Sequence, residues 1–201
     1  NASDEMLDPA AVARLGPNFS YLRRQEPGVS PVPAINAGAE LARGSQIAVV
    51  IDGARMLTPG VVRGILDAGR LARTTVVAVP GYHLGDRLHT AAAERGYTAA
   101  EEQLWLADLD WRADGYRLFT RCVLSASCSN GFLMPMAESN CVAVSRSLWQ
   151  TLRGFDERFT TPGGGFVNLD FYRRAVLARS AVLVVLPGEG AFHQFHGGAT
   201  T

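Results

Sequence analysis

The chain has 201 residues, of which 47% are hydrophobic and 19% are charged, and Lys+Arg and Asp+Glu both total 19. This length suits one domain with a proper core, and a net charge of zero argues against broad binding to nucleic acid or to anionic membranes. No apolar run reaches the roughly 18 residues that a transmembrane helix needs, and the first residues lack a signal-peptide pattern. We therefore expect a single domain over 1–201, a cytoplasmic location and, at most, peripheral contact with a membrane.

The first half of the chain alternates short apolar runs with helical patterns. We predict a strand over 19–23, a helix over 33–43, a strand ending at Asp52, a helix over 59–73 and a strand over 74–79. The run before Asp52 is rich in β-branched residues and free of charge, which is typical of a strand buried on both faces. This alternation predicts an α/β fold with right-handed crossovers and a mostly parallel sheet.

Asp52 stands where the apolar run of its strand stops. Gly53 ends the strand, and Thr58 with Pro59 resembles an N-cap followed by proline at the first helical position. Ligands of open α/β sheets bind at the carboxyl ends of the strands. A carboxylate there can meet a sugar hydroxyl or a metal ion bound to phosphate, or it can simply cap the next turn.

The second half contains shorter patterns, separated by irregular sequence between 82 and 130. We predict, in chain order, a helix over 99–109, strands over 132–136 and 141–145, a helix over 147–153, a glycine loop over 162–165, a helix capped by Asn168 that reaches about 179, and a strand over 181–186. Three cysteines without metal-like spacing indicate buried small side chains in a reducing compartment.

Two histidines near the end of the chain form a candidate metal-binding pair. His193 and His196 are three residues apart and are followed by glycines. Alone, the pair is a weak signal and is more typical of histidines that bind no metal. Together with Asp52, the two side chains suit a hard divalent ion that holds a diphosphate.

Three carboxylates are candidates for a general base. Asp156 and Glu157 precede the glycine loop, and Asp170 follows it. A base that deprotonates a hydroxyl must lie within hydrogen-bonding distance of it. The alternative reading makes Asp156 and Glu157 surface acids and Asp170 a favourable acid in the first turn of a helix.

Taken in order, these residues resemble glycosyltransferase family 2, which has the GT-A fold. The match rests on Asn36-Ala37-Gly38, on Ile51-Asp52-Gly53-Ala54, on Gly154-Phe155-Asp156-Glu157-Arg158-Phe159 and on the histidine tail. The glycine loop with Asn168-Leu169-Asp170, and the tail His193-Gln194-Phe195-His196-Gly197-Gly198, look like a bacterial subgroup of that family. The resemblance implies a three-layer α/β/α sandwich around a mostly parallel sheet. The family's first strand and helix are absent, so we expect an N-terminally incomplete chain.

The resemblance also implies a reaction, in which a sugar moves from a nucleotide-diphosphate sugar to a carbohydrate or other hydroxyl acceptor. Inversion at the anomeric carbon and a divalent Mn or Mg ion are typical of the family. The residues it implies are Asn1, Asp4, Asn36, Asp52 and Gly53 for donor binding; Asp52, His193 and His196 for the metal; and Asp170, Asp156 or Glu157 as the base.

Two departures from the family pattern support a different hypothesis. Ala54 stands where the second acid of the D-x-D motif is expected, and the E-D pair that supplies the base falls on Val167-Asn168. An amide cannot accept the proton. The chain could therefore be a non-catalytic module that binds a nucleotide sugar or a glycan. A sugar-phosphate nucleotidyltransferase is a third hypothesis, which the histidine tail disfavours.

Overall fold

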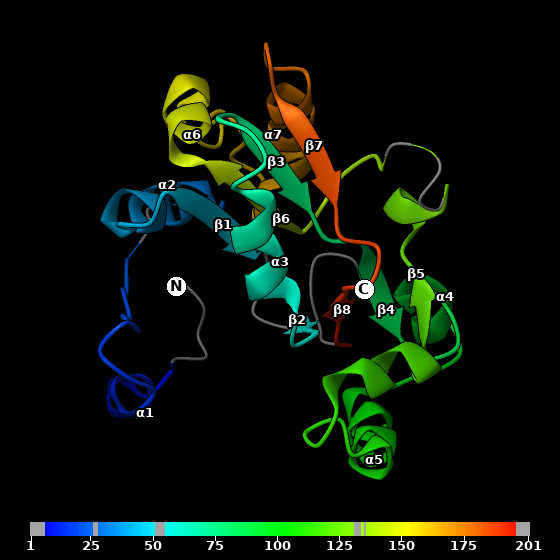
Figure 1. Cartoon of the computed structure of the whole chain (residues 1–201). Coiled ribbons are helices and arrows are strands. Elements are labelled where there is room, and N and C mark those ends of the chain that lie inside the picture. Colours follow the sequence, from blue (N-terminus) through cyan, green and yellow to red (C-terminus); the bar gives the residue numbers. More distant parts are fainter. Residues whose placement is uncertain (1–6, 26–27, 51–54, 131–133, 135, 196–201) are drawn as a thin grey trace.

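The computed structural model describes residues 7–25, 28–50, 55–130, 134 and 136–195, whose strands form two four-stranded sheets (Figure 1). The first sheet has the order β1 (Gln46–Val50), β6 (Cys141–Ser145), β3 (Thr75–Ala78) and β7 (Val182–Val185). The second has the order β2 (Arg55–Leu57), β8 (Ala191–His193), β4 (Gly81–Leu84) and β5 (Cys122–Leu124).

Helices cover both faces of the first sheet, which makes the chain a mixed α/β protein, as expected. On one face, α2 (Val32–Leu41), α6 (Arg146–Leu152) and α7 (Val167–Val176) share a core with Val76 and Val144 of the sheet. On the other, α3 (Val61–Ala68) packs against Val77, Val79 and Ala143. Neighbouring residues of β3 thus point into different cores, as the pleat of a strand requires.

The sheets are mixed, which corrects the prediction of a mostly parallel central sheet. In the first sheet β6 is antiparallel to both β1 and β3, and only β3 and β7 pair in parallel. The reason lies in the segment between β3 and β6, which folds into the second sheet rather than into a crossover helix. The chain consequently enters β6 at the carboxyl end of β3, where the Ser139 hydroxyl donates to the carbonyl of Val79.

Three strands of the first sheet are each followed along the chain by a strand of the second sheet, and of these β4 and β8 run in the same direction whereas β2 runs in the opposite one. β1 precedes β2, β3 is separated from β4 by Val79 and Pro80, and β7 precedes β8. In each case the chain leaves the first sheet at the carboxyl end of the strand. We call the edge formed by the carboxyl ends of β1, β3 and β7 the crossing edge. Residues 51–54, which follow β1 in the chain, lie outside the described residues.

The strand that leads to Asp52 is an edge strand, contrary to the prediction that it is buried on both faces. Ile47 and Val49 face the core, whereas Val50 is 42% exposed. The fully buried strands are β3 and β6, because both have a strand on each side and helices on both faces. A run of β-branched residues is typical of both situations, so the pattern could not separate them.

Most other predicted elements are confirmed within a few residues. The helix over 99–109 is α5 (Ala99–Leu109), whose capping box joins Thr98 and Glu101, and the strand over 141–145 is β6. The helices predicted over 33–43, 59–73 and 147–153 are α2, α3 and α6, and the strands over 74–79 and 181–186 are β3 and β7.

Several predictions fail or need correction. Residues 19–23 form no strand, and the predicted strand over 132–136 lies largely outside the described residues. Between 82 and 130 the chain is more regular than expected, with β4, α4 (His89–Ala93), η1 (Gly115–Arg121), β5 and η2 (Ala126–Cys128). Asn168 lies within α7, whose N-cap is Phe166, and the glycine loop forms a 3-10 turn, η3 (Pro162–Gly164). A short helix near the start, α1 (Pro9–Arg14), buries no residue.

Thr58 holds β2 to the segment before β8 instead of capping a helix. Its hydroxyl donates to the carboxylate of Glu189 and accepts the N–H of Gly190, while the backbone of Thr58 donates to the Gly190 carbonyl. The carboxylate also accepts the hydroxyl of Tyr116. A side chain at residue 60 would collide with Glu189, which explains the glycine there.

Replacing Thr58 by valine tests this connection. The shape is kept, but the buried N–H of Gly190 loses its acceptor, so we expect the free energy of unfolding to fall by about 1–3 kcal/mol. Urea denaturation followed by circular dichroism measures the change. Thr160→Val, at an exposed site, is the matched control and should change stability little.

Candidate functional site

Three histidines from distant parts of the chain gather in the second sheet. His83 lies on β4, His89 is the first residue of α4, and His193 is the last residue of β8. One ring nitrogen of each lies within 4.8 Å of a ring nitrogen of the others. β4 and β8 are parallel neighbours in which His83 and His193 stand opposite each other, so the sheet register brings two of the three together.

Hydrogen bonds define how each ring is oriented. Nε2 of His89 lies 3.1 Å from the carbonyl oxygen of Leu84, which can only accept, so this nitrogen carries a proton. In neutral His89 the other nitrogen, Nδ1, is then an acceptor for Nδ1–H of His193, 3.0 Å away. Nδ1 of His83 accepts the backbone N–H of His89 at 3.1 Å.

A buried carboxylate lies behind the histidines. Glu102 of α5 is 1% exposed, and its oxygens accept the backbone N–H of Phe195 at 3.0 and 3.1 Å. Oε2 of Glu102 is 3.9 Å from Nε2 of His89, and Tyr97 donates to the same oxygen at 3.5 Å. Burial of a carboxyl group is costly without such partners, and the hydrogen bonds to Phe195 hold the tail after β8 against α5.

Burial and positive neighbours keep His83 neutral. Loss of hydration is the main cause, and repulsion from His89, His193 and Arg55 acts in the same direction; together they lower the pKa of His83 to about 4. Arg55 lies on β2 directly opposite His193 in the strand register. The guanidinium also lowers the pKa of Cys141 at the start of β6, although burial raises that pKa overall to about 11. The charge of Arg55 therefore acts on both His83 and Cys141.

Of the predicted metal ligands, only His193 can be placed. Asp52 and His196 lie outside the described residues, as do Asn1, Asp4 and Gly53 from the predicted donor site. The sequence reasoning missed His83 and His89. The chain has only four histidines, so His83 and His89 could have been considered from the sequence. That His83 meets His193 depends on the parallel register of β4 with β8, which the sequence does not reveal.

The described donor set does not fit the Mn or Mg ion that the resemblance implies. Mg²⁺ prefers oxygen ligands, and Mn²⁺ is likewise suited by carboxylate, carbonyl and water. Within the described residues, the grouped ligand atoms are three imidazole nitrogens. Such a set suits Zn²⁺ and related ions.

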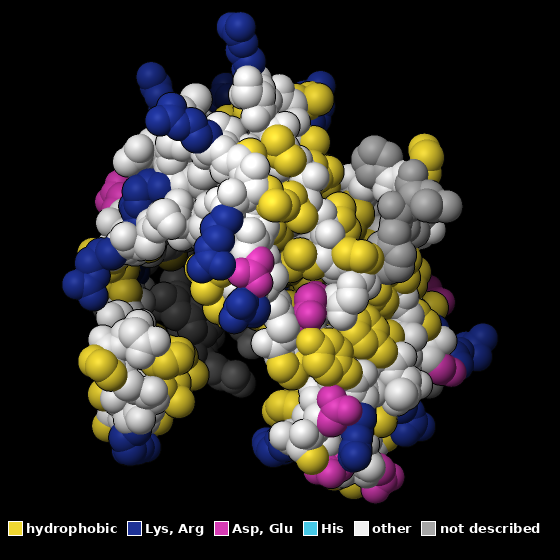
Figure 2. Space-filling model, viewed as in Figure 1, with side chains coloured by type: hydrophobic (Ala, Val, Ile, Leu, Met, Phe, Trp, Pro, Cys, Tyr) yellow, Lys and Arg dark blue, Asp and Glu magenta, His cyan; other side chains and the backbone are white. Residues whose placement is uncertain are grey.

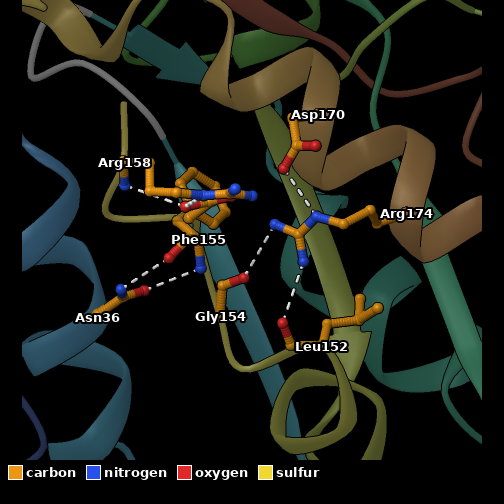
Figure 3. Close-up of polar contacts among 8 residues, drawn as sticks. Asn36, Leu152, Gly154, Phe155, Arg158, Asp170 and Arg174 are labelled. Atoms are coloured by element: carbon orange, nitrogen blue, oxygen red, sulfur yellow. Dashed lines mark hydrogen bonds and ion pairs between the residues drawn. The ribbon is translucent and has the colours of Figure 1, made fainter. Parts of the chain in front are cut away.

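The predicted bases Asp156 and Glu157 lie apart from the histidines, at a cavity of about 410 Å³ lined by Asn36 and by residues 152–158 and 174. Figure 3 shows the amide of Asn36 paired with the backbone of Phe155, with both hydrogen bonds 2.9 Å long. The same amide donates to Glu157 at 3.2 Å. Asn36, predicted to bind the donor, therefore joins α2 to the turn after α6.

Asp156 is engaged by an arginine. Side-chain hydrogen bonds from Arg158, the closest at 2.6 Å, and its backbone N–H lower the pKa of Asp156 to about 2. A carboxyl with such a pKa is a weak base at neutral pH.

Asp170 is engaged in the same way. It accepts Nε of Arg174 at 2.7 Å, and Arg174 donates in turn to the carbonyls of Leu152 and Gly154 (Figure 3). The Asp170–Arg174 pair thereby supplies hydrogen-bond donors to the carbonyl groups at the end of α6. Gly154 has φ +67°, and a Cβ there would lie 2.5 Å from Oδ1 of Asn36, so glycine is required.

Polar side chains do gather at the crossing edge. Asn168, at the start of α7, donates to Asn140 at 2.9 Å, and Asn140 is next to Cys141, which pairs with Val50. Oδ1 of Asn168 is buried and has no hydrogen-bond partner among the described residues. A buried acceptor of this kind marks a place where a ligand hydroxyl or N–H can be bound.

No family model and no curated protein matches the chain. Among the described residues, none of the helices combines the length and the apolar character that a membrane crossing requires.

In the view of Figure 2, hydrophobic side chains run down the middle of the molecule, where α3 and the second sheet lie in Figure 1.

Replacing Asn36 by alanine tests its structural role. The N–H and carbonyl of Phe155 lose their partners, so we expect the free energy of unfolding to fall by about 1–3 kcal/mol. Chemical denaturation measures this change. Asn18→Ala at an exposed position serves as the control, and equal stability of the two variants would contradict the assignment.

His83 makes stability depend on pH. Its folded pKa, about 4, is below its ordinary value of 6.5, so the unfolded chain binds more protons between these values. The stabilisation is complete above pH 6.5 and is lost as the pH falls towards 4. Thermal unfolding between pH 4 and 7.5, with a chelator present, should show a smaller pH dependence for His83→Gln than for His196→Gln.

Proposed function

We propose that the chain is a glycosyltransferase that moves a sugar from a nucleotide-diphosphate sugar to a hydroxyl acceptor, with the donor at the crossing edge. The observation that carries the proposal is the register of β2 and β8, in which Arg55, the first described residue after the segment that contains Asp52, stands opposite His193. The connection that contains Asp52 lies between β1 and β2, and β2 pairs with β8, which carries His193. The order of motifs in the sequence supports the same reading, and a cytoplasmic location belongs to the proposal.

Arg55 and Asn168 supply the polar contacts that such a donor needs. The guanidinium of Arg55 can bind an oxygen of the diphosphate and offset the charge that develops as this group leaves. Oδ1 of Asn168, which has no hydrogen-bond partner among the described residues, is the acceptor for a donor hydroxyl in this proposal. Arg55 and Asn168 are therefore side chains of the right kind for a phosphate and a sugar hydroxyl.

In the reaction, the acceptor oxygen forms a bond to the anomeric carbon while the bond from that carbon to the diphosphate oxygen breaks. The bonding electrons leave with the diphosphate, and the hydroxyl proton passes to a carboxylate base. Asp170, Asp156 and Glu157 stay the candidates for this base. Because Arg158 and Arg174 engage two of these carboxylates, a base role requires an ion pair to open.

The same ion pairs favour a second candidate function, a module that binds a nucleotide sugar without transferring it. Asp156 with a pKa of about 2 accepts protons poorly, and Asn168 takes the position expected for an acid. Both functions share the donor site at the crossing edge, and they differ in turnover.

Donor binding tests the shared site, and turnover separates the two functions. Titration calorimetry with a panel of nucleotide-diphosphate sugars should give binding that Asp52→Asn and Arg55→Gln each weaken about tenfold or more. Asp108→Asn, at an exposed position of α5, is the matched control and should bind as the unmodified chain does. Release of the nucleotide diphosphate, assayed with Mn²⁺ and a panel of acceptors, reports turnover.

The outcomes are distinct. Binding with turnover supports the transferase, and binding without turnover supports the non-catalytic module. If no nucleotide sugar binds, both functions are wrong.

A further inference from the structure

The geometry points to a binding site for one transition-metal ion of the zinc class, held by His83, His89 and His193. The three side chains come from β4, α4 and β8, and one nitrogen of each lies within 4.8 Å of a nitrogen of the others. Three imidazoles form a common ligand set for Zn²⁺, with a fourth position left for water or an oxygen ligand. The inference does not depend on the proposed function.

The closest pair needs little movement to accept an ion. Nδ1 of His89 and Nδ1 of His193 are 3.0 Å apart, whereas two nitrogens on a tetrahedral Zn²⁺ lie about 3.3 Å apart. In the hydrogen-bonded state a proton lies between them. An ion replaces that proton when His193 changes tautomer and carries its proton on Nε2, with no net change in the protonation of the ring.

His89 is held in the tautomer that ligation requires. Its Nε2–H is directed at the carbonyl of Leu84, 3.1 Å away, and Oε2 of Glu102 lies 3.9 Å from the same nitrogen. A metal-bound histidine usually donates its second N–H to a carbonyl or carboxylate, which orients the ring and increases its basicity. The side chain of His89 is 8% exposed and that of Glu102 is 1% exposed, so both are fixed by their surroundings.

His83 completes the ligand set by exchanging one partner for another. Its Nδ1 accepts the backbone N–H of His89, so this nitrogen presents a lone pair. A turn of the partly buried ring directs the same lone pair to the ion. His83 stands opposite His193 in the register of β4 and β8, which keeps the two rings on neighbouring strands.

The charges around the cluster are compatible with a cation. Arg55 opposes a second positive charge, and the buried carboxylate of Glu102 on the other side of His89 offsets it. The three ligands are neutral imidazoles, which prefer Zn²⁺, Co²⁺ or Ni²⁺ to Mg²⁺. The site thus shares His193 with the metal site that the sequence suggests, but it replaces Asp52 and His196 with two further imidazoles and favours a different metal.

Titration of the full chain with Zn²⁺ and Co²⁺ tests the inference after the protein is treated with a chelator. We expect one ion per chain, a visible Co²⁺ absorption band typical of tetrahedral nitrogen ligands, and no competition from excess Mg²⁺. His83→Ala and His193→Ala should each weaken binding more than about tenfold. Circular dichroism confirms that each variant is folded. The third ligand is tested with His89→Ala or, if that variant does not fold, with His89→Gln, and binding should weaken to a similar extent.

Two matched controls identify the site. His196→Ala removes the remaining histidine, and Asp52→Asn removes the predicted carboxylate ligand; both should bind Zn²⁺ as tightly as the unmodified chain. If either control abolishes binding, or if His83→Ala leaves the affinity unchanged, the three-histidine site is wrong. Neither result bears on donor binding, which is measured separately with nucleotide sugars.

Glu102→Gln tests the orienting role of the buried carboxylate. The variant keeps the shape of the side chain and removes its charge, so Zn²⁺ affinity should fall about 10–100-fold with the Co²⁺ band retained. An unchanged affinity would show that Glu102 serves only to hold the tail at Phe195.

Discussion

Two residues, Val79 and Pro80, separate β3 from β4, and this short connection fixes where the second sheet lies. A strand that leaves the centre of the first sheet can reach a new sheet within two residues only at its own carboxyl end. β7 and β8 follow the same course and pair with β3 and β4 in the same parallel sense. The two sheets therefore meet at the crossing edge, and the histidines, Arg55 and the Asn140–Asn168 pair all take their positions from it.

Around this edge, buried polar groups hold segments that are distant in the sequence. Glu102 secures the backbone of Phe195, the carbonyl of Leu84 orients His89, and Thr58 secures the turn before β8 through Gly190. These hydrogen bonds lie among buried side chains, where a lost partner is costly. The same contacts that stabilise the second sheet thus set the geometry of the site, so stability and function are coupled through few residues.

The candidate site divides into parts with different chemistry. The crossing edge offers a cation and an unpaired amide oxygen, which suit a phosphate and a hydroxyl. The histidine cluster offers neutral nitrogens, which suit a soft or borderline metal ion. Asp156 and Asp170 are engaged by arginines beside α6, where they join helices together. This division favours donor binding, which both proposed functions share. The assay of turnover distinguishes the transferase from the non-catalytic module.

Local pattern alone determined the α/β class and elements such as α5 and β6, because helix caps and apolar runs are encoded within a few neighbouring residues. It could not determine strand direction, since β6 runs antiparallel only because the chain returns from the second sheet. Nor could it give Asn36 its partner or bring His193 to His83 and His89, because those contacts join residues more than 100 positions apart. Such pairings follow from sheet register and close packing, which exist only once the tertiary structure has formed.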